Sequence, residues 1–188
     1  MTTTDPVGAR PRDAVDEIIG QWGRVRPDLD VSAMQVFGRL HRSFLLYRSA
    51  IGERFTDVGT TEPGFDVLAA LRRSGAEQRL SAGELARQTL VTTGGLTLRV
   101  KRLEKDGLVR RERDPEDHRM VYVSLTDAGR ELVDRTADLH FPNMARMLEG
   151  LTAGERDDLA RLLGRLFDCL QEATPGLDLT EAAAAAER

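Results

Sequence analysis

The chain has 188 residues, of which 40% are apolar and 31% are charged, so it is long enough to bury the core of one ordinary domain. A single cysteine, Cys169, excludes an intramolecular disulfide framework, and no segment reaches the roughly 20 apolar residues of a membrane span. The N-terminal sequence lacks the apolar stretch of a secretory signal, so we expect a cytoplasmic protein without membrane contact.

The formal net charge of −4 argues against a general attraction to nucleic acid, but the charges are unevenly distributed. Residues 81–125 hold nine bases and seven acids, whereas the rest of the chain has a net charge of −6. A solvated surface would explain this small local excess equally well. If the chain binds nucleic acid, residues 81–125 are nevertheless where the contact is expected.

The first elements are helices. Residues 1–11 have the composition of a disordered segment, and apolar residues at helical spacing then predict a short amphipathic helix over 12–23. Ser32 can cap a longer helix, and Pro63-Gly64 introduces a compact helix with the sequence FDVLAALRRSG. The apolar positions of the first two helices are Val15, Ile18, Ile19 and Trp22, then Val36, Leu40, Phe44, Tyr47 and Ile51.

A short helix, a turn and a second helix follow. Ser81 and Glu84 form a capping box, which predicts the start of the short helix. The second helix begins near Thr92 or Thr93 and ends at Gly107, a residue type that favours helix ends.

Residues 111–123, RERDPEDHRMVYV, predict two extended strands with turn residues Pro115 and Asp117 between them. Most charged hairpins are solvated surface features, but this one directly follows a helix pair. A capped helix, a turn, a second helix and a hairpin together indicate a winged helix-turn-helix. The second helix would then enter the DNA major groove, and the hairpin would reach the backbone or minor groove with a base such as Arg119.

Two further helices complete the domain. Thr126 predicts the start of a long helix, and Thr152 with Glu155 forms a second capping box before another helix. Both helices are apolar on one face, and residues 173–188 form a low-complexity tail rich in alanine. We therefore expect a mainly α protein with a small β-hairpin wing, in which a winged helix-turn-helix at about 62–125 is flanked by dimerisation helices at about 12–55 and 126–172.

The second helix of the pair has two different faces. Leu96, Val100 and Leu103 share a narrow face and predict the buried stripe. The outward face holds Gly94, Thr97, Leu98, Lys101 and Lys105, which include the only two lysines of the chain. An amphipathic surface helix explains the lysines equally well, but not Gly94 and Gly95, which cost up to ~1 kcal/mol each relative to alanine.

The segment TTGGLTLRVKRLEKDGLVRRERDPEDHRMVYVSLTDAGR resembles the recognition helix and wing of the MarR family of transcriptional regulators. With the flanking helices, the resemblance covers roughly residues 12–172. It implies a homodimer that binds a palindromic operator in double-stranded DNA and usually responds to small anionic or phenolic ligands. We expect this chain to be a repressor that such a ligand releases from DNA. The candidate DNA contacts are Thr92, Thr93, Gly94, Thr97, Leu98, Lys101, Arg102, Lys105, Arg113, Asp117, His118 and Arg119.

A narrower resemblance, to the urate-responsive branch of the family, rests on the extra N-terminal helix, the RPDLD and FDVLAALRRSG segments and the phrase GGLTLR. It implies a urate site made by Trp22, Asp66, Arg99 and Arg111. Leu98 and His118 depart from the branch pattern, which commonly has asparagine and arginine there. Leu98 could contact a thymine methyl group, and His118 removes a permanent charge from the wing.

The residues themselves also make three of these positions unusual. Asp66 lies in a helix that is apolar nearly all round, where an unpaired carboxylate would be costly. Arg99 lies about 60° from the buried stripe, and Arg111 shares strand parity with Val109, so both are predicted to turn inward. Two arginines and one acid would leave a positive charge for an anion to balance. A structural salt bridge between Asp66 and an arginine, with Trp22 in the core, is the alternative.

Other chemistry is weakly indicated. His41, His118 and His140 show no metal-ligand spacing, so we predict no metal, no cofactor and no enzyme. Cys169 lies on an apolar helix face, where packing is favoured over oxidant sensing. Another anion, such as a tricarboxylate, or a phenolic ligand remains an alternative effector. A winged-helix module that binds protein instead of DNA remains an alternative function, and it would bind no duplex even at low salt.

Overall fold

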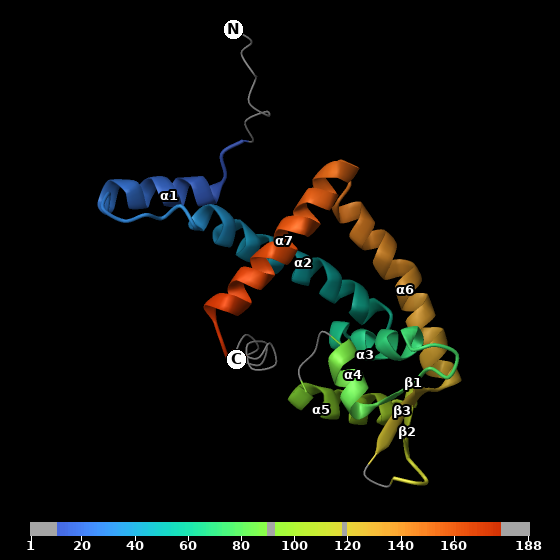
Figure 1. Cartoon of the computed structure of the whole chain (residues 1–188). Helices are drawn as coiled ribbons and strands as arrows, with labels where there is room; N and C mark the ends of the chain where they lie inside the picture. The colour runs from blue at the N-terminus through green and yellow to red at the C-terminus, as the bar shows by residue number, and fades with distance from the viewer. Residues whose placement is uncertain (1–10, 90–92, 118–119, 178–188) are drawn as a thin grey trace. The chain divides into compact units, whose positions relative to one another are not determined.

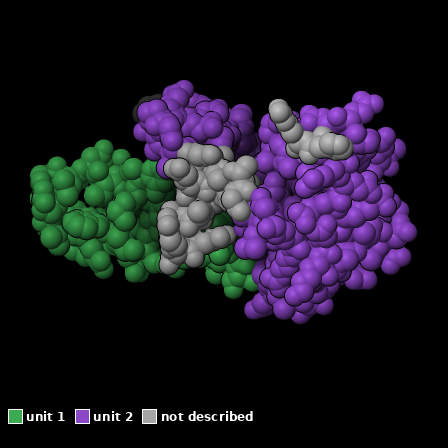
Figure 2. All heavy atoms as spheres, turned by 90° about the horizontal axis from the view of Figure 1, so that it is seen from below, with its two compact units in different colours: residues 1–50 green, residues 51–188 purple. Residues whose placement is uncertain are grey.

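The computed structural model describes residues 11–89, 93–117 and 120–177, with only the backbone described at 93 and 94. The chain divides into two compact units, residues 1–50 and residues 51–188 (Figure 2). Within the described ranges, no helix combines the length and apolar character needed to cross a bilayer.

The first unit contains α1 (Ala14–Val25) and the first part of α2 (Met34–Asp57) (Figure 1). Asp13 caps α1 in a capping box with Asp16, and Arg39 of α2 binds both carboxylates at 3.0 and 2.8 Å. A side chain at Gly38 would lie 2.9 Å from Val15, so glycine allows the two helices to pack closely. The predicted amphipathic helix is therefore present, shifted by two residues.

The second unit holds the remaining elements and the main core. Their order is α3 (Glu62–Arg73), β1 (Arg79–Ser81), α4 (Ala82–Gln88), α5 (Thr93–Lys105), β2 (Val109–Arg113), β3 (Val121–Leu125), α6 (Asp127–Met147) and α7 (Ala153–Ala173). The mainly helical fold with a hairpin wing is confirmed. The predicted caps Ser81, Thr126 and Thr152 begin α4, α6 and α7, whereas α3 begins at Glu62, so that Pro63 lies within its first turn. The predicted alanine-rich tail lies largely outside the described residues.

The wing belongs to a three-stranded antiparallel sheet with the order β1-β3-β2. Val109 pairs with Leu125 and Arg113 with Val121, so the hairpin strands are five residues each. β1 adds three residues on the other side of β3, with Ser81 opposite Tyr122. The two-stranded hairpin is present as expected, but the sequence did not predict the third strand, β1, which pairs with it.

The core of the second unit lies where α3, the sheet and the start of α6 meet. The central residues of α3, Val67, Leu68, Ala70 and Leu71, are completely buried. The other elements contribute Ile51, Phe55, Leu85, Leu96, Val100, Leu103, Val109, Val123, Leu125, Leu132 and Val133. The core therefore fixes α5 and the base of the wing on one scaffold, with α3 packed against α5 and α5 against β2.

The start of α6 is joined closely to the loop between α5 and β2. The Thr126 hydroxyl donates to the carbonyl of Gly107 at 2.7 Å, and the Thr126 amide donates to the carbonyl of Leu108 at 3.1 Å. Arg130 donates from Nε to Oε1 of Gln78 at 2.7 Å, one residue before β1. Gln78 is buried and has a positive φ of 48°. α6 is therefore bonded to both flanks of the wing.

Candidate nucleic-acid interface and effector site

The faces of α5 are distributed as predicted. Leu96, Val100 and Leu103 are 5–6% exposed, which confirms the buried stripe. On the other side, Thr97, Lys101, Arg102 and Lys105 are exposed, and Leu98 is 72% exposed. A single exposed leucine is an ordinary surface feature, so the location of these residues on one face of α5 is the relevant observation.

The start of α5 is only partly described. Thr92 lies outside the described residues, and the structure gives only the helical backbone of Thr93 and Gly94. α5 begins at Thr93, where the sequence places the helix start.

The wing tip carries one predicted basic contact and one predicted acidic contact within the described residues. Arg113 and Asp117 are exposed, whereas His118 and Arg119 lie outside the described residues. The Asp114 carboxylate accepts hydrogen bonds from the amides of Glu116 and Asp117 at 2.8 and 2.9 Å. These hydrogen bonds, chiefly that from Asp117, lower the pKa of the Asp114 carboxyl. Asp114 was not among the predicted site residues, although an aspartate at the start of a turn commonly makes these bonds.

Asp66 and Arg99 lie on α3 and α5, two helices that contact each other. Asp66 is half-buried on α3 between buried Phe65 and Val67. Arg99 is half-buried on α5, and its Nη1 atom is shielded from solvent. The prediction that Arg99 turns toward the domain is therefore confirmed.

Arg111 has a different environment from the one predicted. Its guanidinium forms an ion pair with Glu104 of α5, with Nε 2.8 Å from Oε2, and the residue is exposed. Arg111 thus lies on the side of β2 that faces α5, as strand parity predicts, but it is exposed and its charge is paired with Glu104. The hydrogen bond from Arg111 lowers the pKa of the Glu104 carboxyl. The predicted surplus of positive charge also took no account of Glu104.

Trp22 belongs to the other unit, on α1, and it is 42% exposed in the single chain. Cys169 is also exposed, although its apolar surroundings in the sequence favoured packing. That expectation is wrong for the single chain, since none of the residues of α7 is buried.

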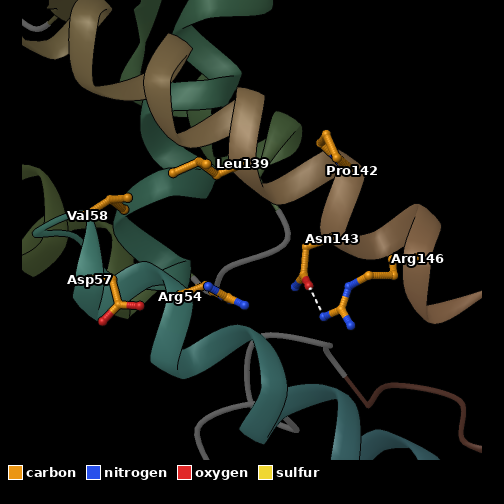
Figure 3. Close-up of a pocket in the computed structure, with 7 residues that line it drawn as sticks. All are labelled: Arg54, Asp57, Val58, Leu139, Pro142, Asn143 and Arg146. Atoms are coloured by element: carbon orange, nitrogen blue, oxygen red, sulfur yellow. Dashed lines mark hydrogen bonds between the residues drawn. The ribbon is translucent and has the colours of Figure 1, made fainter.

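A cavity of about 300 Å³ lies elsewhere in the second unit, between the end of α2 and the C-terminal half of α6 (Figure 3). Arg54, Asp57, Leu139, Asn143 and Arg146 are among its lining residues. Arg146 donates to Oδ1 of Asn143 at 2.9 Å. Leu139 is 55% exposed, so one wall of the cavity is open to solvent. None of the predicted effector residues lines this cavity.

Comparisons with known proteins agree with this arrangement. The sequence profile of the MarR family matches residues 58–120, which include the helix pair and the first strand of the wing. The HTH-type transcriptional regulator PecS of Dickeya dadantii is 37% identical over 152 residues, covering 81% of this chain and 92% of PecS. Sco3205, a MarR family transcriptional regulator from Streptomyces coelicolor solved in complex with DNA, is similar with a TM-score of 0.70 and 28% identity, covering 81% of this chain and 97% of Sco3205.

A second solved structure is BpsR of Bordetella bronchiseptica, whose DNA binding is regulated by 6-hydroxynicotinic acid. It is similar with a TM-score of 0.62 and 27% identity, covering 70% of this chain and 98% of BpsR. The reading helix, the wing and these relatives lead to one assignment. The chain belongs to the MarR family of winged-helix transcriptional regulators, which are DNA-binding proteins and not enzymes.

Proposed function

We propose that this protein is a homodimeric repressor that leaves a palindromic operator when a small organic anion, such as urate, binds to it. The observation that carries the proposal is Arg99, a half-buried arginine on the same helix that exposes Thr97, Leu98 and Lys101. A ligand bound by Arg99 would act directly on the element that reads DNA. Of the residues that the family resemblance implies, Asp66, Arg99 and Arg111 lie in the second unit, and we propose that these three contribute to the effector site.

The ion pair between Arg111 and Glu104 supports a mechanism for release. It joins the last turn of α5 to β2, so it connects the reading helix to the wing. Exposed ion pairs contribute only ~0–1 kcal/mol, so an anion can replace Glu104 on Arg111 at small cost. The exchange would remove one direct link between α5 and the wing strand and bias the relative orientation of the two DNA-contacting elements, while the core contacts between α5 and β2 remain. A ligand that binds only this rearranged state shifts the population away from the DNA-binding state.

The relative BpsR favours a second candidate effector of related chemistry. Its effector, 6-hydroxynicotinic acid, is a small aromatic acid with an anionic carboxylate. Urate and this acid share a flat ring and one negative charge. Arginine binds both kinds of group well, because its planar guanidinium can pair with an anion or stack on a ring.

The homodimer is supported by apolar residues that the single chain leaves exposed. On α2, Phe37, Leu40 and Phe44 are 38–49% exposed, and α7 has an apolar row with no buried member. Monomeric proteins rarely expose so many large apolar residues on neighbouring turns. A second copy of the chain would cover these residues with its own copy of the same apolar surface, because a two-fold symmetric interface uses the same surface on both subunits.

A gel-shift titration tests the effector. The DNA is the duplex upstream of the protein's own gene, and urate, 6-hydroxynicotinic acid and citrate are added in turn. We expect Asp66→Asn and Arg99→Ala to keep the fold while raising the urate concentration needed for release roughly 10- to 100-fold, because one charged hydrogen-bond partner is worth ~1.5–3 kcal/mol.

Arg54→Ala and Arg146→Ala are the matched controls, since both remove an arginine from the α2–α6 cavity. They should leave the urate response unchanged. If they abolish it while Asp66→Asn and Arg99→Ala do not, the effector binds in that cavity. Thermal melting separates a ligand role from a structural one. A destabilisation of roughly 3–5 kcal/mol in Asp66→Asn, with no urate-induced shift in the unmutated protein, would show a buried structural ion pair instead.

A further inference from the structure

Arg79 and Tyr122 stack on one face of the three-stranded sheet. The Cζ atom of Arg79 lies 3.8 Å from the centroid of the Tyr122 ring, and both residues are half-buried. Arg79 pairs with Ser124 and Ser81 pairs with Tyr122, so the two side chains are diagonal neighbours on adjacent strands. A guanidinium at this distance is held by cation–π attraction and by planar stacking.

This stack lies where the sheet narrows from three strands to two. Ser81 is the last residue of β1, and its partner Tyr122 is the last residue of β3 that β1 supports. From there the hairpin continues as β2 and β3 alone, through the pair Arg113–Val121, into the wing tip. A two-stranded hairpin is only marginally stable by itself, so the direction of the wing depends on what supports its base.

The environment of Arg79 is that of a packing residue more than of a free surface charge. Its Nε atom is buried and, within the described residues, has no hydrogen-bond partner. Burying such a nitrogen costs free energy, which the contact with the ring offsets. Arg110, on the same face, differs because it is exposed and is bound to Glu112 and to the hydroxyl of Ser124.

We propose that Arg79 is a positioning residue for DNA binding, which fixes the direction of the wing by stacking on Tyr122. The inference rests on the proposed contact between the wing and DNA. Without the stack, the wing would populate several directions, and the apparent affinity for DNA would fall by the fraction of molecules that hold the binding direction. Arg79 itself would touch no phosphate.

The dependence of DNA affinity on salt tests this, because a lost phosphate contact and a lost orientation have different signatures. Each phosphate contact contributes a slope of about −0.9 to the plot of log affinity against log salt. We expect Arg79→Ala to weaken binding to the duplex upstream of the protein's own gene by roughly 5- to 30-fold, with the slope unchanged. Arg79→Lys should also weaken binding, although it keeps the charge.

Substitutions of Tyr122 test the contribution of its ring to the stack. Tyr122→Leu should weaken binding as much as Arg79→Ala, and the double variant should be no weaker than either single variant. Tyr122→Phe keeps the ring and should bind like the unmutated protein. Circular dichroism on each variant checks that the fold is retained.

Two results would overturn the proposal. If Arg79→Ala makes the slope shallower by about 0.9 and Tyr122→Leu has no effect, then Arg79 is itself a phosphate contact. If Arg79→Ala, Arg79→Lys and Tyr122→Leu all bind normally, the stack does not position the wing. Arg113→Ala tests the underlying wing contact separately, because it should make the slope shallower whether or not Arg79 has the proposed role.

Discussion

Gly129, in the first turn of α6, lies against the backbone that connects α5 to β2. A side-chain carbon at this position would lie 1.9 Å from the carbonyl oxygen of Leu108. That oxygen also accepts the amide of Thr126, so it cannot move away without breaking the bond. Only glycine at this position allows the close contact between α6 and the loop that connects the reading helix to the wing.

Gly129→Ala should therefore destabilise the protein by about 3 kcal/mol or more, because overpacking against a fixed backbone atom typically costs 1–3 kcal/mol and here the overlap is severe. Gly83→Ala on α4 is the matched control, since the added carbon would make only an ordinary contact with Arg87 at 3.7 Å. It should change stability by less than about 1 kcal/mol, and in the stabilising direction. Urea denaturation of both variants makes the comparison, and equal stabilities would contradict the contact.

His140 gives a second residue-scale prediction. It packs among Phe55, Phe65 and Phe141 with ring centroids 5.0–5.6 Å apart, and burial lowers the pKa of its imidazole below the ordinary value. Below about pH 6.5 the unfolded chain therefore binds a proton that the folded chain does not, so stability falls as the pH falls through this window. The loss ends once the pH is below the lowered pKa, where both states are protonated.

Melting temperatures at pH 7.5 and 5.5 measure this effect, with His140→Phe as the control because it keeps a neutral ring in the cluster. The unmutated protein should lose more stability than the variant. Carboxylates lose their contribution to stability in a separate, lower pH range. The pKa of Asp134 is lowered by the hydrogen bond from Arg72, so its contribution is lost only below the ordinary carboxyl pKa of about 4. Identical pH profiles for the two proteins would show that folding does not lower the pKa of His140.

At the scale of elements, α6 and α7 begin in the same way but are anchored differently. Thr126 and Thr152 each cap a helix by accepting an amide hydrogen bond, from Gly129 and Glu155 respectively. Thr126 also donates to Gly107 across the fold, whereas the Thr152 hydroxyl donates within its own capping box. The start of α6 therefore carries tertiary as well as local structure.

Thr126→Val should cost about 1 kcal/mol for the lost cap and about 1 kcal/mol more for the bond to Gly107. Thr152→Val should cost less, because the Glu155 carboxylate that loses the Thr152 hydroxyl keeps its bond from the Thr152 amide. Thermal or urea denaturation of the two variants gives the difference directly. A loss in Thr126→Val no larger than that in Thr152→Val would mean that the bond to Gly107 contributes nothing to stability.

These elements also show what the sequence could and could not predict. The caps Ser81 and Thr152 were predictable because a capping box is a local pattern of four residues, and Thr126 because threonine is a common N-cap. β1 was not, because three residues carry too little alternation, and the strand exists only through pairing with β3 some forty residues later. Local patterns therefore predict helix starts, whereas pairing between distant segments decides the third strand.

In the candidate site, too, local features were predictable from the sequence, whereas contacts between distant segments were not. The half-burial of Arg99 followed from its angle to the buried stripe of its own helix. The partner of Arg111 did not follow from strand parity, because Glu104 lies on a different element and parity predicts a face but not a partner. Tyr122 was predictable as a strand residue, but its stack with Arg79 depends on the unpredicted strand.

At the scale of the whole molecule, α7 has a row of large apolar residues that the single chain leaves exposed to solvent. Leu159, Leu162, Leu163, Phe167 and Leu170 are 39–51% exposed, and burying them against a second copy would contribute several kcal/mol at about 25 cal/mol per Å². We therefore expect a dimer at micromolar concentration, with a melting temperature that rises with protein concentration.

Leu162→Glu tests this arrangement, because it removes a leucine from the proposed interface and places a charge there. The combined loss of about 3 kcal/mol or more should weaken dimerisation at least roughly 100-fold, which sedimentation velocity would detect as monomer. Leu177→Glu is the matched control, since Leu177 is 57% exposed beyond the end of α7 and should leave the dimer intact. If the unmutated protein sediments as a monomer at micromolar concentration, the apolar row has another partner, and a two-fold protein reading a palindromic operator is no longer supported. If Leu162→Glu becomes monomeric and loses DNA binding together, the two half-sites are read by two copies joined through α7.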